Sequence, residues 1–226
     1  MDIETTLGQA ERVPCGKTER QQTGFMQWLC GQFGKPTGFW GRIAGWIMAT
    51  RTSNRERNAW VVRLLDIQTR DWILEIGCGP GLAIGQLGTL AREGYIVGVD
   101  HSDVMLQQAR RRNAEAVRLG RVDLRLASVS ALSSMQEQFD KVLSVNSIQF
   151  WESPVERLRE LRSLMRPDGT IAIALQPRWK GATDGDAQTA GHELVAQLKA
   201  AGFDQVRLEF KRMKPVSVVC AMGVNG

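Results

Sequence analysis

The sequence predicts an α/β fold, with a doubly wound, mostly parallel seven-stranded sheet that ends in an antiparallel hairpin. Short apolar segments that suit buried strands alternate with segments of helical periodicity from residue 72 onward, as in parallel sheets covered on both faces. The last two strand-like segments are separated only by Met213-Lys-Pro215, and so short a connection requires antiparallel pairing. An aromatic-rich segment before the first strand predicts a helical extension at the N-terminus.

The N-terminal part of the chain divides into two segments of different composition. Residues 1–23 are polar and aperiodic, which predicts a flexible arm. Residues 24–58 are expected to form a helical lid or cap, because apolar side chains recur there at helical spacing: Phe25, Trp28, Leu29 and Phe33, then Trp40, Ile43 and Ile47. Asn54 is predicted to cap a further helix. Residues 59–226 then form the main domain.

The main domain is predicted to alternate strands with helices. Strands are expected near residues 72–77, 95–100, 122–127, 140–145, 170–176, 205–211 and 216–221. Helices are expected near residues 81–92, 102–118, 154–166 and 188–201. Ligands of open parallel sheets bind beyond the carboxyl ends of the strands, so the residues that follow these strands are the candidates for a functional site.

The first strand leads into a loop with glycine at alternate positions, Gly77, Gly79 and Gly81. Glycine lets the backbone turn sharply and lets a ligand lie against it, and the following helix offers unpaired N–H groups. Asp100 ends the next strand along the chain, where a carboxylate is well placed to accept hydrogen bonds from both ribose hydroxyls of a nucleoside. The loop and the acid together predict a nucleoside cofactor site.

The spacing of the glycines argues against a dinucleotide. The fingerprint G-x-G-x-x-G would need glycine or alanine where the chain has Leu82 or Ile84. The pattern Glu75-x-Gly77-x-Gly79-x-Gly81 instead resembles the first motif of the class I S-adenosylmethionine-dependent methyltransferases. Two later stretches resemble further motifs of that family: Val99-Asp100-His101-Ser102 followed by Met105, and Leu164-Met-Arg-Pro-Asp-Gly169. The resemblance extends from about Trp60 to Val219, and the chain is identified as a member of that family, of the small-molecule type.

The resemblance implies a Rossmann-like methyltransferase fold that binds S-adenosyl-L-methionine and releases S-adenosyl-L-homocysteine. It implies that the glycine loop cradles the methionyl part, that Asp100 holds the ribose, and that the Asn146 carbonyl meets the ammonium group. Met105 either flanks the nucleoside or is an ordinary core methionine. The predicted cofactor-binding residues are Glu75, Gly77, Cys78, Gly79, Gly81, Asp100, His101, Met105, Ser128, Val129 and Asn146.

Two stretches depart from patterns found among methyltransferases. After the third strand the family often has Gly-Asp-Ala, whereas this chain has Ala127-Ser-Val129 and no acid for the adenine amino group. Ser128 and the Val129 N–H are the available substitutes. After the fourth strand, Asn146-Ser-Ile-Gln-Phe150 lacks the prolines of the N-P-P-Y motif found in methyltransferases that act on nucleobases. This second departure disfavours a nucleic-acid substrate.

The acceptor site is predicted from aromatic and polar residues near the expected cleft: Trp28, Trp40, Trp46, Gln149 and Trp151. Residues 24–50 have three open interpretations, namely a lid over the acceptor, a weak membrane-surface contact, or a layer packed on the sheet's helices. Packing against the helix at 154–166 is likewise the alternative for Gln149 and Trp151. The catalytic residues are unknown, because neither histidine, His101 or His192, is placed as a general base.

These features predict an enzyme that moves a methyl group by in-line displacement to a small, apolar or aromatic acceptor. The net charge of +5 keeps open a nucleic-acid or protein substrate, and a non-catalytic binding module is a further alternative. The start of the chain lacks a signal peptide and no apolar run spans a bilayer, so a cytoplasmic protein is expected. The four cysteines lack C-x-x-C spacing, so reduced thiols and no metal site are expected; the oligomeric state stays open.

Overall fold

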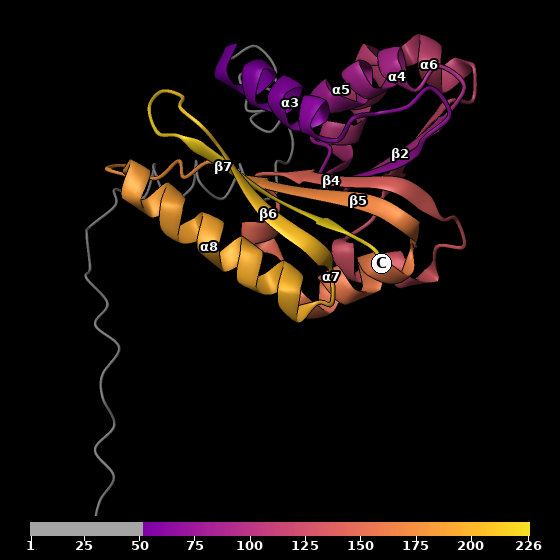
Figure 1. The fold of residues 1–226 in the computed structure, drawn as a ribbon. Helices are drawn as coiled ribbons and strands as arrows, with labels where there is room; N and C mark the ends of the chain where they lie inside the picture. Colours follow the sequence, from indigo (N-terminus) through magenta and orange to yellow (C-terminus); the bar gives the residue numbers. More distant parts are fainter. Residues whose placement is uncertain (1–51) are drawn as a thin grey trace, which may run out of the picture.

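A seven-stranded sheet lies between two helical layers in the computed structural model, which describes residues 52–226 apart from the side chains of residues 133 and 134 (Figure 1). One layer holds α3 (Thr52–Leu64), α4 (Leu82–Leu90), α5 (Asp103–Arg112) and α6 (Ala114–Arg118). The other layer holds α7 (Pro154–Ser163) and α8 (Asp184–Ala200). The predicted arm at 1–23 and most of the predicted cap at 24–58 lie outside the described residues.

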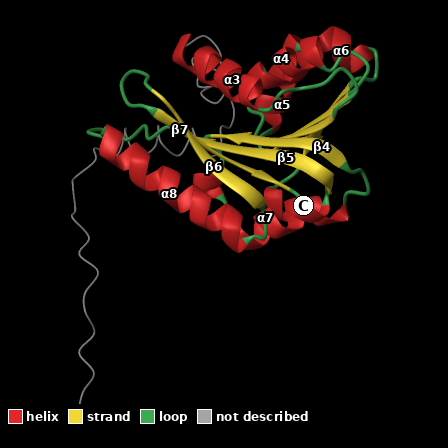
Figure 2. Ribbon diagram, viewed as in Figure 1, coloured by secondary structure: helices red, strands yellow, loops and turns green. Residues whose placement is uncertain are grey.

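The strands follow the predicted topology, drawn in yellow in Figure 2. They are β1 (Trp72–Ile76), β2 (Tyr95–Asp100), β3 (Val122–Leu126), β4 (Phe139–Val145), β5 (Met165–Leu175), β6 (Asp204–Lys211) and β7 (Val218–Val224). Their order is β3-β2-β1-β4-β5-β7-β6; the first five run parallel, and β7 is antiparallel to both of its neighbours. The predicted fold class is therefore confirmed. The chain runs outward from β1 to β3 and then returns to β4 on the other side of β1, so the strand order reverses between β1 and β4. Ligands of open parallel sheets bind beyond the carboxyl ends of the strands at such a point.

Apolar side chains pack against both faces of the sheet. Successive strand residues point to opposite faces, so Ile73 of β1 joins the core under α4 while its neighbour Leu74 joins the core under α7 and α8. This two-sided burial explains why the parallel strands are almost continuously apolar. Among the described residues, no helix combines the length and the apolar character that crossing a bilayer requires.

Several predicted boundaries were wrong in instructive ways. The helix expected at 102–118 is divided at Asn113, whose buried Nδ2 donates to the Ala109 and Gly81 carbonyls. The helix expected at 188–201 begins at Asp184, because Thr183 and Asp186 form a capping box. The last strand ends at Val224 rather than 221, since pairing with β5 and β6 extends that far.

The predicted N-cap role of Asn54 is also wrong. Asn54 lies inside α3 and is buried, and its carbonyl accepts a 2.7 Å hydrogen bond from the Asn58 side chain. The Asn54 Oδ1 accepts a 3.0 Å hydrogen bond from the Arg57 guanidinium. Asn54 therefore makes buried hydrogen bonds within α3 and is not the N-cap of a helix.

Candidate cofactor and acceptor site

The glycine loop connects β1 to α4 and holds all three glycines in the left-handed region. Gly77, Gly79 and Gly81 have φ angles of 69°, 52° and 75°, which residues with a Cβ adopt only under strain. The N–H groups of Gly77 and Cys78 both donate to the Val99 carbonyl, at 2.9 and 3.0 Å. The loop is therefore fixed to the end of β2.

The three glycines differ in what surrounds them. A Cβ on Gly77 would collide with the Ser147 side chain, and a Cβ on Gly81 would lie 3.0 Å from the Ala109 Cα. A Cβ on Gly79 would meet nothing within 4 Å. Gly77 and Gly81 thus allow elements to pack closely, whereas Gly79 presents bare backbone to open space that a ligand can approach.

Asp100 joins the end of β2 to the glycine loop. Its Oδ2 accepts from the Gly79 N–H at 2.8 Å and its Oδ1 accepts from the Ser102 N–H at 2.9 Å. The side chain is buried, and desolvation raises its pKa, while the hydrogen bonds from Ser102 and Gly79 oppose that rise. Ser102 caps α5 by accepting from the Met105 N–H, so Asp100 is not that cap. Each carboxylate oxygen keeps capacity for a further donor.

Glu75 lies behind the loop in the middle of the sheet. It is 2 % exposed, and its Oε2 has no hydrogen-bond partner among the described residues. Burial, with a smaller contribution from the Asp100 charge, raises the pKa of Glu75 to about 8. A hydrogen bond from the Ile84 N–H in α4 partly offsets this rise. The fold therefore holds an acid that is largely protonated at neutral pH directly below the loop.

The carboxyl ends of β4 and β5 are joined by Asn146, whose φ of 55° is unusual for a residue other than glycine. Its Oδ1 accepts from the Gln176 N–H at 2.8 Å, and its Nδ2 donates to the Gln176 carbonyl at 3.4 Å. Gln149 is exposed on the short helix η2 (Ile148–Phe150). Trp151 is 8 % exposed and donates to the Ser147 Oγ at 3.1 Å, so its burial favours the packing interpretation.

The remaining predicted cofactor residues follow the strands β1, β2 and β3 in the sequence, and they differ in solvent exposure. His101 is exposed, with its Nδ1 3.9 Å from the Asp100 carboxylate, whereas Met105 is only 1 % exposed, as a core methionine would be. Ser128 is exposed and Val129 begins the short helix η1 (Val129–Ser134). Burial raises the pKa of the Cys78 thiol well above its ordinary value, so the thiol is a poor nucleophile.

Trp28, Trp40 and Trp46, the aromatic part of the predicted acceptor site, lie outside the described residues. The binding roles of all the predicted site residues, in this segment and elsewhere, stay predictions. Among the residues that the structure describes, no cluster of three histidine, cysteine or acidic side chains is placed to hold a metal ion.

Sequence reasoning missed the residues that support the loop from α5. Arg112 donates to the Pro80 carbonyl at 3.0 Å, and Asn113 donates to the Gly81 carbonyl at 3.1 Å. No motif marks these two residues. The sequence offers one weak signal for them. Arg112 and Asn113 lie at the end of α5, a helix that buries Met105, Leu106 and Ala109.

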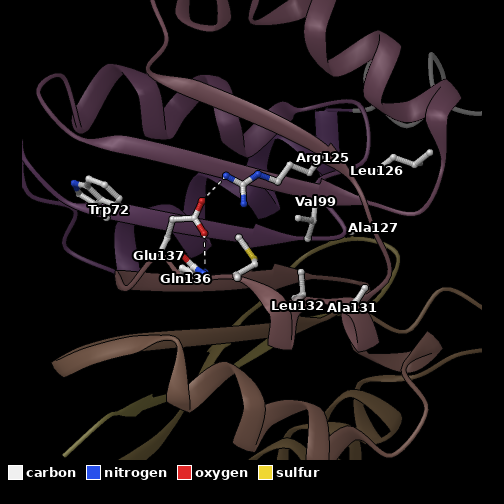
Figure 3. Close-up of a pocket in the computed structure, with 10 residues that line it drawn as sticks. Trp72, Val99, Arg125, Leu126, Ala127, Ala131, Leu132, Gln136 and Glu137 are labelled. Atoms are coloured by element: carbon white, nitrogen blue, oxygen red, sulfur yellow. Dashed lines mark hydrogen bonds and ion pairs between the residues drawn. The ribbon is translucent and has the colours of Figure 1, made fainter.

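A cavity of about 770 Å³ lies on the sheet face that α7 and α8 cover, between β1–β3 and η1 (Figure 3). Trp72, Val99, Ala127 and Leu132 contribute to its walls, and Arg125 and Glu137 form a 2.6 Å ion pair beside it. None of the glycine-loop residues lines this cavity. The cavity approaches the carboxyl edge of the sheet only near Leu126 and Ala127, so it is separate from the open space over Gly79.

The arrangement defines a class of protein before any comparison is made. A nucleoside cofactor suits this arrangement: a glycine loop with bare backbone at Gly79, and a buried acid at the end of the next strand, both beside the point where the strand order of the doubly wound sheet reverses. The Asp100 oxygens have spare capacity to accept hydrogen bonds, which suits the polar groups of such a cofactor.

Comparison with known proteins identifies the family. A family model described as a methyltransferase domain matches residues 73–169. An uncharacterized methyltransferase of Bacillus subtilis, YdaC, is 34% identical over 179 residues, covering 79% of this chain and 96% of its own. The chain therefore belongs to the class I S-adenosylmethionine-dependent methyltransferases, as its motifs predicted, and S-adenosyl-L-methionine is its cofactor.

Two further similarities add to this comparison. A ubiquinone biosynthesis O-methyltransferase of Roseobacter denitrificans is 35% identical over 97 residues, covering 43% of this chain and 38% of its own. The crystal structure of the N-methyltransferase NodS from Bradyrhizobium japonicum, in complex with S-adenosyl-L-homocysteine, superposes with a TM-score of 0.63 at 16% identity, covering 88% of this chain and 97% of its own. The second similarity supports the fold alone.

Proposed function

We propose that this methyltransferase transfers a methyl group to a small acceptor, apolar or aromatic in part, that binds beyond the carboxyl ends of β4 and β5. The observation that carries the proposal is the open space over Gly79, whose N–H donates to Asp100 at the end of β2. Asn146 directly follows β4, which pairs with β1 on the other side. Phe150 and Trp179, which follow β4 and β5, are 54% and 56% exposed and offer aromatic surface at this edge. The relative named for ubiquinone biosynthesis also supports a small acceptor.

The proposed reaction requires few catalytic groups from the protein. The sulfonium cofactor brings an already activated methyl group. In our proposal, Asp100 holds the ribose and the backbone of the glycine loop holds the methionyl part. Asn146 fixes the ends of β4 and β5 relative to each other. Alignment of the acceptor at near-contact distance and exclusion of water then supply much of the acceleration. No general base is assigned.

The arginines at 110–125 give little support to a nucleic-acid substrate. Four of the six make contacts within the fold: Arg110 with the Leu124 carbonyl, Arg112 with the Pro80 carbonyl, Arg121 with the Gly88 carbonyl, and Arg125 with Asp123 and Glu137. Guanidinium groups engaged in this way are less available to neutralise phosphates. The structure thus favours the small acceptor over a polyanionic one.

The proposal is tested by measuring methyl transfer from labelled cofactor to a panel of small phenols, thiols and amines, with single-stranded RNA and duplex DNA in parallel. We expect label in at least one small acceptor and none in the nucleic acids. Transfer confined to the nucleic acids, with affinity that falls steeply as salt rises, would overturn the proposal.

The raised pKa of Glu75 predicts an unusual pH dependence of stability. The folded state keeps this proton between the ordinary pKa of 4.5 and about 8, whereas the unfolded chain releases it. The contribution of Glu75 is therefore fully present below pH 4.5 and is lost as pH rises to 8. The unfolding free energy of the wild type should therefore fall as pH rises through this range, and that of Glu75→Gln should fall less steeply. The two slopes should differ by up to about 1 kcal/mol per pH unit.

Urea unfolding at pH 5, 6 and 7 measures this difference, with Glu115→Gln on the exposed face of α6 as the control. Parallel pH profiles for wild type and Glu75→Gln would show that Glu75 titrates normally in the folded protein.

A further inference from the structure

Two loops at the carboxyl edge of the sheet each place an apolar side chain between basic ones. The loop from β5 to α8 contains Arg178-Trp179-Lys180, and Trp179 is 56% exposed. The loop from β6 to β7 begins with Lys211-Arg-Met-Lys214, whose second and fourth residues are exposed. Neither loop contributes to the proposed binding of the cofactor, so their shared pattern calls for a separate explanation.

The two loops lie side by side. The Asp184 Oδ1, at the start of α8, accepts from the Ser217 N–H, at the end of the second loop, at 2.8 Å. The strand register agrees, because Leu175 and Phe210 both pair with Val219 of β7. Both loops project from the same side of the molecule, at the left of Figure 1. The exposed aromatic and unpaired basic side chains of this region form what we call the edge patch: Trp179, Lys180, Phe210, Arg212 and Lys214.

The edge patch lies in a region with an excess of positive charge. Residues 176–186 and 211–217 contain five lysines and arginines against two aspartates, a net charge of +3. Both aspartates accept hydrogen bonds that hold the start of α8 and the base of the second loop. Within residues 52–226, no ion pair joins a carboxylate to Lys180, Arg212 or Lys214. Three cations of the patch therefore face solvent unpaired by the described fold.

The chain before α3 joins the fold beside this patch. Glu56 lies one turn after the start of α3 and pairs with Lys211 at 3.1 Å. Residues 24–50, which contain six large aromatic residues, therefore connect to the described fold next to the second loop. A membrane-surface contact was one of the open interpretations of that segment. The position of the patch is consistent with it.

The side chains of the edge patch suit the surface of an anionic bilayer. Exposed aromatic residues such as Trp179 and Phe210 insert at the level of the lipid headgroups, and lysine and arginine are attracted to anionic headgroups. Single-stranded nucleic acid also suits aromatic and basic side chains. The patch, however, borders the edge where an acceptor with an apolar part is proposed to bind, and apolar molecules partition into bilayers. The observations therefore favour lipid.

We propose that the edge patch docks on the surface of an anionic phospholipid bilayer, from which the methyl acceptor enters its site. Trp179 and Phe210 insert among the headgroups, while the three unpaired cations contact lipid phosphates. The docking stands by itself, whereas the route of the acceptor rests on the proposed function. That route narrows the acceptor to a lipid-soluble molecule.

The test measures co-sedimentation of the intact chain with vesicles that contain equal parts of phosphatidylglycerol and phosphatidylcholine. Vesicles of phosphatidylcholine alone and single-stranded polyuridylate are measured in parallel. The first variant removes the three unpaired cations together, as Lys180→Gln, Arg212→Gln and Lys214→Gln. The second variant is Trp179→Ala. All of these positions are exposed, so the variants should fold as the wild type does.

A matched control removes the same charge at the opposite edge of the sheet. It combines Arg92→Gln, Arg118→Gln and Lys199→Gln, which are exposed and precede the amino ends of β2, β3 and β6. The control should bind the anionic vesicles as the wild type does, because its substitutions face away from the proposed bilayer.

We expect the wild type to bind the anionic vesicles and to bind phosphatidylcholine alone far more weakly. The patch triple variant should lose about 100-fold in affinity, because three attractions to anionic headgroups are removed. Trp179→Ala should lose about tenfold, since an apolar side chain no longer enters the interface. Its remaining binding should keep the steep dependence on salt, which the triple variant should lose.

The proposal is overturned if the wild type does not sediment with anionic vesicles, if the two triple variants lose affinity equally, or if Trp179→Ala binds unchanged. Binding to polyuridylate in place of the vesicles would reject it in favour of nucleic acid. Because sedimentation measures docking alone, a lack of methyl transfer to every small acceptor would reject the proposed function and leave this result standing.

Discussion

Replacing Asp100 with alanine is expected to weaken the binding of S-adenosylhomocysteine about 100-fold, because two hydrogen bonds to a charged group are lost together. The carboxylate lies at the end of β2, accepts from the Gly79 N–H at 2.8 Å, and so is positioned against the loop over which the cofactor is proposed to lie. Asp100→Asn keeps the shape of the side chain and one acceptor oxygen, so its loss should be smaller. Calorimetric titration measures both affinities.

Asp103→Asn is the control for this measurement, because Asp103 is exposed in the first turn of α5 and contacts Gln107. It should leave the affinity within about twofold. Urea unfolding of each variant separates a lost ligand contact from a damaged fold, since Asp100 also accepts from the Ser102 N–H. An unchanged affinity in a folded Asp100→Ala protein would refute the ribose assignment.

The second large effect distinguishes two glycines of the same loop. Gly81→Ala should lower the free energy of unfolding by about 3 kcal/mol or more, because left-handed strain adds to a collision with Ala109 and Asn113. Gly79→Ala carries only the backbone strain of about 1 kcal/mol, since its Cβ meets nothing within 4 Å. That Cβ enters the space proposed for the cofactor, so the affinity for S-adenosylhomocysteine should fall at least about tenfold.

Urea unfolding and calorimetry on both variants test this contrast. Gly120→Ala is the control for backbone strain alone, because Gly120 also has a positive φ, of 70°, and an open surrounding, but lies far along the chain at the end of α6. A Gly79→Ala protein that binds normally would show that the cofactor does not lie against this part of the backbone.

The fold could be predicted because its determinants are local in the sequence. Apolar periodicity marks each strand, and the short connection at Met213–Pro215 requires an antiparallel pair that the structure contains between β6 and β7. The glycine loop was predictable for the same reason. Left-handed backbone conformations favour glycine, and the sequence shows glycine at positions 77, 79 and 81. The early start of α8 was missed because Gly185 interrupts the helical pattern, although Thr183 and Asp186 formed a readable capping signal.

The unpredicted part of the site depends on contacts between distant residues. Arg57 meets Gln176 across 119 positions of sequence, and no local pattern connects the two. Helical spacing could have placed Arg57 on the buried face, four residues before Val61, but not in contact with an amide at the end of β5. Asn113 was missed similarly, because a helix that looks continuous in sequence is divided by contacts with Gly81 and Ala109.

The attachment of the glycine loop to β2 has a thermodynamic consequence. Because Gly77 and Cys78 share the Val99 carbonyl and Gly79 is held by Asp100, the cradle acquires its final conformation when the sheet forms. The entropy lost in ordering this backbone therefore counts against folding and not against association with the nucleoside. A receptor surface that is preorganised in this way can bind its cofactor without first restricting its own motion.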